Sequence, residues 1–290
     1  MSGQLNLLTV DLEEWYVVEA LTARFGSDQW QGLESTVVRN TRVLLDLFEH
    51  KDVRATFFIL GWCAERHPQL IAEIAERGHE VACHSYQHVR VDKLTPEAFR
   101  EDTVRAIDAI VKACGVKPRG YRAPSWSINP SCSWAFRILA ELGFDYDSSI
   151  FPIKHDIYGM PDAPRQLFRM SFDDGKQLWE FPCATFRIFG YNLPLAGGGY
   201  LRHSPYWYSA FMINRLNRQG MPAMVYIHPW EIDPEPPKIE GLTSVQKFRT
   251  YGSTDILGRK LYKLLSDYQF TTISDYVSRQ IRKPIGFAHS

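Results

Sequence analysis

The sequence predicts an α/β fold in which a parallel sheet is covered by helices, either as an open doubly wound sheet or as a barrel. Within the first 150 residues, short apolar runs alternate with longer segments of helical periodicity, which indicates repeated strand–helix units. Charged residues or histidines directly follow several of these runs, and α/β proteins place active sites at such strand ends. The chain of 290 residues is long enough for one large α/β domain or two small ones.

Each predicted strand is a short, mostly apolar run that is bounded by polar, Gly or Pro residues. The predicted strands occupy residues 5–10, 54–60, 79–83, 120–122, 178–181 and 223–227. Apolar residues at helical spacing, together with helix start and stop signals, predict helices at residues 36–50, 68–77, 95–115 and 130–142. Gly78 and Gly143 end two of these helices, and Thr95 begins another as an N-cap followed by Pro96.

The regular pattern loosens after about residue 151. Residues 161–164 are predicted to form a loop, and the glycines at 197–199 a flexible or tightly turned element. The prolines at 234, 236 and 237 make a stiff connection to a last part that is predicted as helix, strand and helix. Because internal repeats are absent, we expect one domain over residues 1–290. Its core units lie in residues 1–150 and its elaborated loops in residues 151–290.

Composition narrows the functional classes. A formal net charge of +0 gives no electrostatic case for nucleic acid or for an anionic membrane surface. The 5 cysteines are odd in number and form no CxxC pair, which argues against a disulfide framework and suits a reducing compartment. Neither a secretory signal pattern nor an apolar stretch of the roughly 20 residues that span a bilayer is present in the sequence, so we expect a cytoplasmic protein without a transmembrane segment. The many aromatic residues weakly favour a carbohydrate ligand.

Two histidines and an acidic pair indicate a metal site. His84 and His88 are four residues apart and follow one apolar run, and Asp11 and Glu13 end another. Two imidazoles and one carboxylate, with positions left open for water and substrate, are typical of a catalytic rather than a structural zinc site. The sequence therefore predicts a divalent metal at the carboxyl ends of the strands.

Four segments in this order resemble the motifs of the NodB-homology polysaccharide deacetylases, which are the family 4 carbohydrate esterases. They are Thr9–Glu14 (TVDLEE), His84–His88 (HSYQH), Arg122–Trp126 (RAPSW) and Tyr226–Trp230 (YIHPW). The resemblance covers residues 5 to 150 and the region of His228, and it implies a distorted (β/α) barrel with fewer than eight regular strands. Residues 197–202, 228–231 and 247–252 are similar to a cytoplasmic subgroup associated with bacterial exopolysaccharide gene clusters.

The resemblance assigns a metal, most simply zinc or another divalent transition metal, to His84, His88 and one acidic residue. The family's adjacent Asp-Asp pair is interrupted here by Leu12. Strand alternation places Asp11 and Glu13 on the same side, which makes Glu13 the preferred ligand and Glu14 the alternative.

The resemblance also assigns the catalytic roles. Asp11 would be the general base that takes a proton from the water at the metal, and Arg122 would keep it ionised and oriented. His228 would be the general acid that protonates the departing amine, and Glu231 or Asp233 would raise its pKa. The family's fourth motif normally supplies that carboxylate, and its nearest counterpart here is Glu180. The predicted substrate contacts are Ser125, which supplies a backbone N–H to the oxyanion, and Trp126, Gly198, Tyr200 and Trp230.

Each residue has a simpler interpretation when it is taken singly. Asp11 could be a helix N-cap, Arg122 a surface ion pair and His228 a packed core histidine, and the three glycines could form only a turn. A lone pair of histidines four apart is usually a chance pairing. The motifs standing together in order favour the catalytic interpretation.

The activity that this resemblance implies is metal-dependent removal of the N-acetyl group from an N-acetylhexosamine, in a bacterial polysaccharide or its lipid-linked precursor. The alternatives are hydrolysis of a small amide or cyclic ureide on the same barrel, and an inactive glycan-binding barrel. The expected partner is an N-acetylated glycan and not a nucleic acid. Relatives also suggest a homo-oligomer, and any membrane association is expected to come through a partner.

Overall fold

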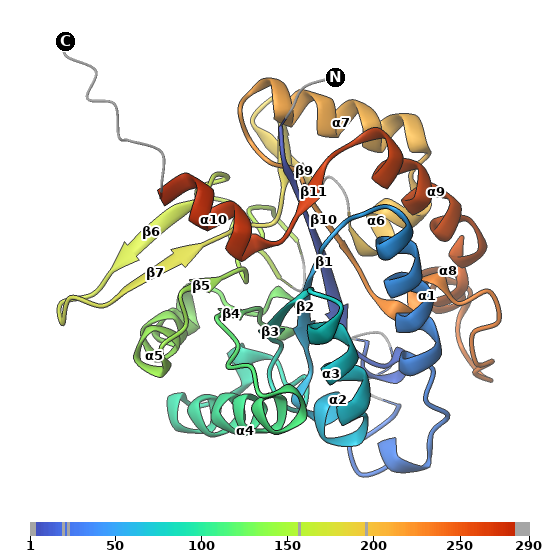
Figure 1. The fold of residues 1–290 in the computed structure, drawn as a ribbon, viewed down its shortest axis with the longest axis horizontal. Helices are drawn as coiled ribbons and strands as arrows, with labels where there is room; N and C mark the ends of the chain where they lie inside the picture. The colour runs from blue at the N-terminus through green and yellow to red at the C-terminus, as the bar shows by residue number, and fades with distance from the viewer. Residues whose placement is uncertain (1–3, 19–20, 22–23, 156–157, 195–196, 282–290) are drawn as a thin grey trace.

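The computed structural model describes residues 4–18, 21, 24–155, 158–194 and 197–281. A curled sheet of nine strands forms its centre, and the strands follow one another in the order β10-β1-β2-β3-β4-β5-β7-β6, with β11 beside β1 (Figure 1). The strands are β1 (Asn6–Leu12), β2 (Thr56–Ile59), β3 (Glu80–Cys83), β4 (Gly120–Tyr121), β5 (Tyr146–Asp147), β6 (Phe168–Ser171), β7 (Gln177–Glu180), β10 (Met224–Ile227) and β11 (Phe270–Thr271).

The neighbours from β10 through to β7 are parallel, and only β6 at the edge is antiparallel. In the part of the chain that the structure describes, β10 and β6 do not pair with each other, so the sheet curls without closing. This confirms the expected distorted barrel, which has an additional C-terminal part. Because the neighbours are parallel, their carboxyl ends meet at the same edge of the sheet.

Helices cover the outside of the curled sheet (Figure 1). They are α1 (Val37–His50), α2 (Gly61–Arg66), α3 (Pro68–Glu76), α4 (Pro96–Cys114), α5 (Trp134–Leu142), α6 (Gly198–His203), α7 (Tyr206–Arg218), α8 (Ser244–Tyr251), α9 (Thr254–Asp267) and α10 (Ile273–Ile281). Helices therefore lie in all four segments where the sequence predicts them, and the predicted C-terminal order of helix, strand and helix is confirmed. No helix among the described residues has both the length and the apolar character that crossing a membrane requires.

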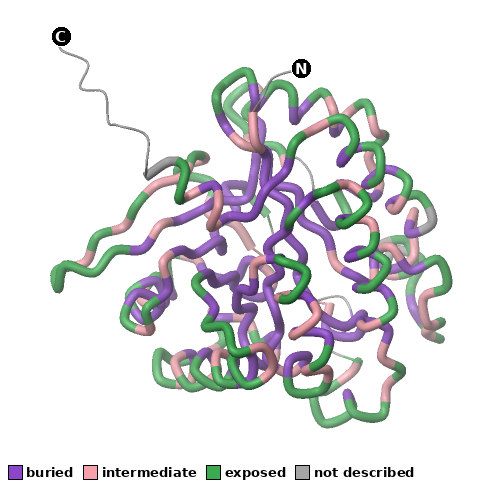
Figure 2. Tube along the Cα trace, in the orientation of Figure 1, coloured by how far each residue is buried: buried purple, intermediate pink, exposed green. Residues whose placement is uncertain are grey.

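Most strands of the central sheet are buried by this arrangement of helices. All seven residues of β1 are buried, because helices cover one face of the strand and the barrel interior covers the other. Figure 2 shows the same buried centre and exposed outer helix surfaces. Along β1, Thr9 and Asp11 lie on one face, so both can meet a residue inside the barrel.

The sequence did not predict the hairpin of β8 (Thr185–Ile188) and β9 (Tyr191–Pro194), nor the helices α2, α6, α7 and α8. Helix α7 was missed because it carries apolar residues on two faces. Met212 and Leu216 are buried whereas Trp207 and Phe211 are exposed, which obscures the one-sided periodicity of an amphipathic helix. The predicted loop at 161–164 is confirmed.

Candidate active site

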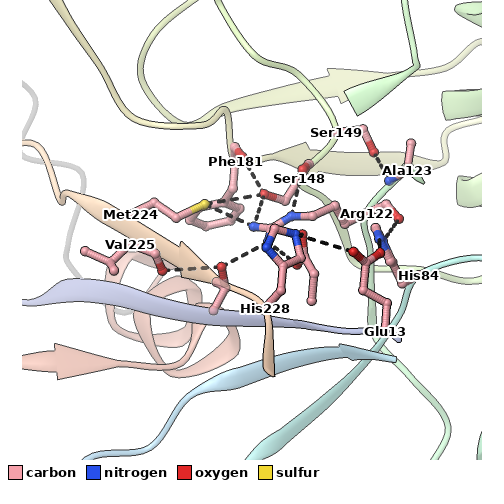
Figure 3. A network of polar contacts seen from close by, with 12 residues as sticks. Glu13, His84, Arg122, Ala123, Ser148, Ser149, Phe181, Met224, Val225 and His228 are labelled. Carbon is pink, nitrogen blue, oxygen red and sulfur yellow. Dashed lines mark hydrogen bonds and ion pairs between the residues drawn. The ribbon is translucent and has the colours of Figure 1, made fainter. Parts of the chain in front are cut away.

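The functional residues predicted from the sequence converge at the carboxyl ends of neighbouring strands. Asp11 and Glu13 come from the end of β1, His84 follows β3, Arg122 follows β4, and His228 follows β10. Figure 3 shows the side chains of Glu13, His84, Arg122 and His228 pointing toward one another. These strand ends bring together residues that are more than two hundred positions apart in the sequence.

Glu13, His84 and His88 form a cluster in which one ligand atom of each residue lies within 4.8 Å of the others. Glu13 Oε2 is 2.8 Å from His88 Nε2 and 3.7 Å from His84 Nε2. Burial alone would raise the pKa of Glu13, but the nearby His88 and His84 outweigh it and hold that pKa well below its usual range. An ionised carboxylate and two imidazoles fit a divalent transition metal such as zinc.

The backbone fixes the direction in which His84 points. Its Nδ1 donates a hydrogen bond to the carbonyl oxygen of Arg122 at 2.8 Å, which leaves Nε2 to face Glu13. Metal-binding histidines commonly have their other ring nitrogen held by such a backbone carbonyl. This hydrogen bond also ties His84 to the end of strand β4, where Arg122 lies.

A tight loop, not a helix, presents the two histidines. Ser85 and His88 have φ angles of 63° and 56°, in the left-handed region that residues other than glycine rarely adopt. Asp102 of α4 accepts hydrogen bonds from the N–H groups of Tyr86 and Gln87, and Ser85 Oγ accepts one from His88 N–H. Strained backbone held by its surroundings in this way is common at functional sites. No signal in the sequence identified Asp102 as the support of this loop.

Glu14, the alternative ligand, faces away from the histidines. Its carboxylate accepts hydrogen bonds from the Thr36 backbone N–H at 3.1 Å and from the Ser35 hydroxyl, just before helix α1 begins. The geometry therefore favours Glu13 as the ligand, as strand alternation predicts. Glu14 instead supports the connection between β1 and α1.

Arg122 is fully buried and holds Asp11. Its Nη1 lies 2.6 Å from Asp11 Oδ1 and donates to Thr9 Oγ1, and its Nη2 donates to Ser148 Oγ. A buried charge pair whose remaining donors also have partners keeps a fixed geometry. Arg122 and Asp11 were predicted from the sequence. Thr9 stands in the first motif but was given no role, and Ser148 belongs to no recognisable motif.

The Trp126 side chain is buried next to Arg122, so its ring is not open to solvent as a surface on which a sugar could stack. Its side chain is only 7% exposed, and its ring lies 4.7 Å from the Arg122 guanidinium carbon. Phe151 and Tyr226 cover it further, with ring centroids 5.4 and 5.3 Å away. The prediction of a substrate contact is therefore corrected: the aromatic ring helps to hold Arg122, because the loop folds it inward.

His228 is held by Glu231. Its Nδ1 is 2.9 Å from Glu231 Oε2, which also accepts the His228 backbone N–H, and its Nε2 is 3.9 Å from Asp11 Oδ2 and 3.8 Å from Glu13 Oε1. Burial alone would lower the pKa of His228, but Glu231, Glu13 and Asp11 outweigh it and raise that pKa to about 9. The imidazole is thus poised as a protonated group that faces two carboxylates.

Trp230 lies beside both His228 and Glu13. Its ring stacks on His228 with centroids 5.3 Å apart, and its Nε1 donates to Glu13 Oε1 at 3.4 Å. Arg202 of α6 lies behind, with its Nε 3.5 Å from Glu231 Oε1. The sequence placed Arg202 in a suggestive segment but gave it no role, because contact with Glu231 depends on how α6 packs.

Two other carboxylates considered for His228 lie elsewhere. Asp233 accepts hydrogen bonds from Arg39 and Asn40 at 2.9 and 3.0 Å. Glu180 lies opposite Asp147 in the ladder of β5 and β7 and accepts the Ile150 N–H at 3.0 Å. Burial and the neighbouring Asp147 raise the pKa of Glu180 well above its usual range. Glu231 is the carboxylate in contact with the imidazole.

The remaining predicted substrate contacts border the site. Gly197 pairs with Tyr226, and Gly198, with φ 48°, opens α6 directly against that ring, where an added Cβ would lie 3.1 Å from it. Tyr200 is partly exposed on the same helix. Ser125, with φ 50°, lies in the short turn after Arg122. Their contact with substrate stays a prediction.

An open parallel barrel with a two-histidine, one-carboxylate cluster at its strand ends is the arrangement of a metal-dependent hydrolase. Residues 29–146 match the family described as polysaccharide deacetylase, and residues 148–278 match a domain of unknown function, DUF3473. The first of these segments is thus similar to the polysaccharide deacetylases, and the second, C-terminal segment is similar to DUF3473.

Individual relatives show a similarity of the same kind. The chain is 31% identical over 84 residues to a peptidoglycan-N-acetylglucosamine deacetylase of Bacillus cereus, which is 29% of this chain and 30% of that protein. It is 30% identical over 107 residues to a peptidoglycan deacetylase of Helicobacter pylori, which is 37% of this chain and 36% of that protein. The alignments thus span about a third of these relatives.

The fold extends further than the sequence similarity. A solved structure from Mycobacterium smegmatis, assigned to the polysaccharide deacetylases, superimposes with a TM-score of 0.63 over 97% of this chain and 91% of its own, at 20% identity. This similarity covers the C-terminal part as well as the core. It establishes the common fold.

Proposed function

We propose that this protein is a metal-dependent deacetylase that removes the N-acetyl group from an N-acetylhexosamine of a bacterial polysaccharide or its lipid-linked precursor, releasing acetate. One observation carries the proposal. A carboxylate bound to a buried arginine, Asp11, and an imidazole bound to a carboxylate, His228, face each other at 3.9 Å beside the cluster of Glu13, His84 and His88. The proposal includes zinc as the metal and a cytoplasmic location.

Hydrolysis of an amide needs a nucleophile at the carbonyl carbon and a proton for the amine. A divalent metal bound by Glu13, His84 and His88 would activate water and polarise the acetyl carbonyl. Asp11 would accept the proton of the attacking water. Its Oδ1 is bound to Arg122, and its Oδ2 faces His228.

The collapse of the tetrahedral intermediate needs a general acid, because an amine anion does not leave. His228 Nε2 faces the site and would give its proton to the amine nitrogen as the C–N bond breaks. Ser125, in the turn Pro124–Trp126, would supply its backbone N–H to the developing oxyanion. The products are acetate and a free amino sugar.

The proposal is tested with purified protein incubated with an N-acetylated chito-oligomer, before and after chelation. Acetate release that is lost on chelation and restored by zinc is the expected result. Hydrolysis of small amides or cyclic ureides, without acetate release from the glycan, would replace the proposal by the alternative amidohydrolase. Glycan binding by zinc-loaded protein without acetate release would instead identify an inactive binding barrel.

Glu231→Gln is expected to move the alkaline limb of the kcat/KM profile to lower pH. A general acid works only while it is protonated, so activity falls as pH rises through the His228 pKa of about 9. Because Glu231 raises that pKa, the variant should lose activity nearer the usual value of about 6.5. Both proteins are fully loaded with zinc when their pH profiles are measured, so that the zinc ion affects the two profiles in the same way.

Asp233→Asn is the matched control for this experiment. Asp233 lies two residues further along but bonds Arg39 and Asn40 and does not bond His228. Its alkaline limb should coincide with that of the unmodified protein. An unmoved limb in Glu231→Gln would show that His228 is not the titrating acid.

A further inference from the structure

Residues 181–230 contain no Asp or Glu, although the whole chain has 33 acidic residues. The same fifty residues contain four arginines and many aromatic residues, and they include the β8–β9 hairpin and helix α7. A chain whose formal net charge is +0 therefore has one segment that is uniformly basic. The net charge of the whole chain does not reveal this uneven distribution of acidic residues.

Helix α7 presents aromatic rings and arginines to solvent on one face. Trp207 and Phe211 are 68% and 51% exposed, and Arg215 and Arg218 are exposed as well. Their spacing of four, four and three residues places them in one stripe along the helix. Since its opposite face is already buried in the core, nothing within the fold requires these large aromatic residues outside.

The β8–β9 hairpin exposes a further aromatic residue at its tip. Phe189 is 96% exposed and has a φ of 47°, followed by Gly190 with a φ of 85°. Asn or Asp followed by Gly is the usual choice for such a two-residue turn, and a bulky side chain in the left-handed region is strained. A residue that is both strained and fully exposed brings no benefit to the folded chain by itself.

The hairpin and the helix form one surface. The guanidinium carbon of Arg215 on α7 lies 5.7 Å from the ring of Phe186 on β8. We call the surface defined by Phe189, Trp207, Phe211, Arg215 and Arg218 the aromatic–arginine face. No carboxylate among the described residues pairs with its two arginines.

We propose that the aromatic–arginine face docks on the surface of an anionic phospholipid bilayer. Tryptophan and phenylalanine enter the interfacial region of a bilayer, and arginines bind its phosphate groups. The segment 181–230 contributes no acidic side chain that the anionic lipid would repel. The protein would thus bind a membrane through its own surface, whereas sequence analysis expected a partner to be needed.

The test is co-sedimentation of the full-length protein with vesicles of phosphatidylcholine alone or with added phosphatidylglycerol. Binding only to the anionic vesicles, weakened by salt, is the expected result. Combined Arg215→Gln and Arg218→Gln should lower the affinity by at least about tenfold. Combined Phe189→Ser, Trp207→Ser and Phe211→Ser should lower the affinity similarly, and tryptophan fluorescence of the unmodified protein should shift to the blue on binding.

A matched control replaces exposed residues of another helix. Val104→Ser, Val111→Ser and Lys112→Gln, all on α4, remove two exposed apolar side chains and one cation without touching the face. This variant should bind as the unmodified protein does. Absence of binding to any vesicle, or an equal loss in the α4 control, would overturn the proposal. So would light scattering that shows a dimer broken by the aromatic replacements, because the face would then join two copies of the chain.

Discussion

Glu13→Gln is expected to abolish metal binding and acetate release together, whereas Glu14→Gln should retain both. Glu13 contributes the only carboxylate of the cluster with His84 and His88, and an amide is a much weaker ligand than an ionised carboxylate. Glu14 is equally buried but bonds Thr36 and Ser35. Metal content by mass spectrometry, measured beside acetate release, checks the prediction.

The two variants are closely matched because they make the same chemical change at adjacent positions. Glu14→Gln should show a loss of stability of about 1–3 kcal/mol, since its carboxylate is buried and hydrogen-bonded. Urea unfolding separates that effect from metal loss. Metal retained at full occupancy in Glu13→Gln, or lost in a folded Glu14→Gln, would disprove the assignment of Glu13.

The strand pattern and the motif order were sufficient to predict where the site lies. Asp11, His84, Arg122 and His228 each follow or end an apolar run, and parallel neighbours bring such ends together. The preference for Glu13 over Glu14 followed from alternation along the strand, which continues far enough beyond β1 to keep Asp11 and Glu13 on the same side. Both patterns involve residues that are close together in the chain, so they can be recognised in the sequence alone.

The supports of the site could not be predicted, because they depend on tertiary packing. Thr9 and Ser148 hold Arg122, and Asp102 holds the histidine loop. Thr9 lies in the first motif without an assigned role, and Ser148 and Asp102 carry no spacing signal. Trp126 was misread for the same reason: whether an aromatic residue faces a ligand or the core depends on neighbours that come from distant strands.

The site is divided between the segments that the family comparisons recognise. His84, His88 and Arg122 lie within residues 29–146, whereas His228 and Glu231 lie within residues 148–278, and Asp11 and Glu13 precede both. Neither segment therefore contains the base, the metal ligands and the acid together. In the proposed mechanism, the general acid would therefore come from the segment that matches DUF3473.

Asp11→Asn is expected to lower kcat by about 10²–10⁴-fold while zinc stays bound. Asparagine keeps an oxygen for Arg122 but cannot accept a proton, so the variant removes the proposed base without opening a cavity. Some stability should be lost, because Arg122 is fully buried and would lack its counter-charge. Metal content, urea unfolding and kcat are therefore measured on the same preparation.

Thr9→Val provides the control for the structural part of this effect. It removes a hydrogen bond from the same Nη1 of Arg122 but leaves the Asp11 carboxylate in place. If Asp11 acts as the base, Thr9→Val should lose stability with only a small change in kcat, and Asp11→Asn should lose far more kcat for a similar loss of stability. Equal kcat in folded, zinc-loaded Asp11→Asn and the unmodified protein would show that another group accepts the proton. Equal losses of kcat in the two variants would mean that Asp11 acts only by positioning Arg122.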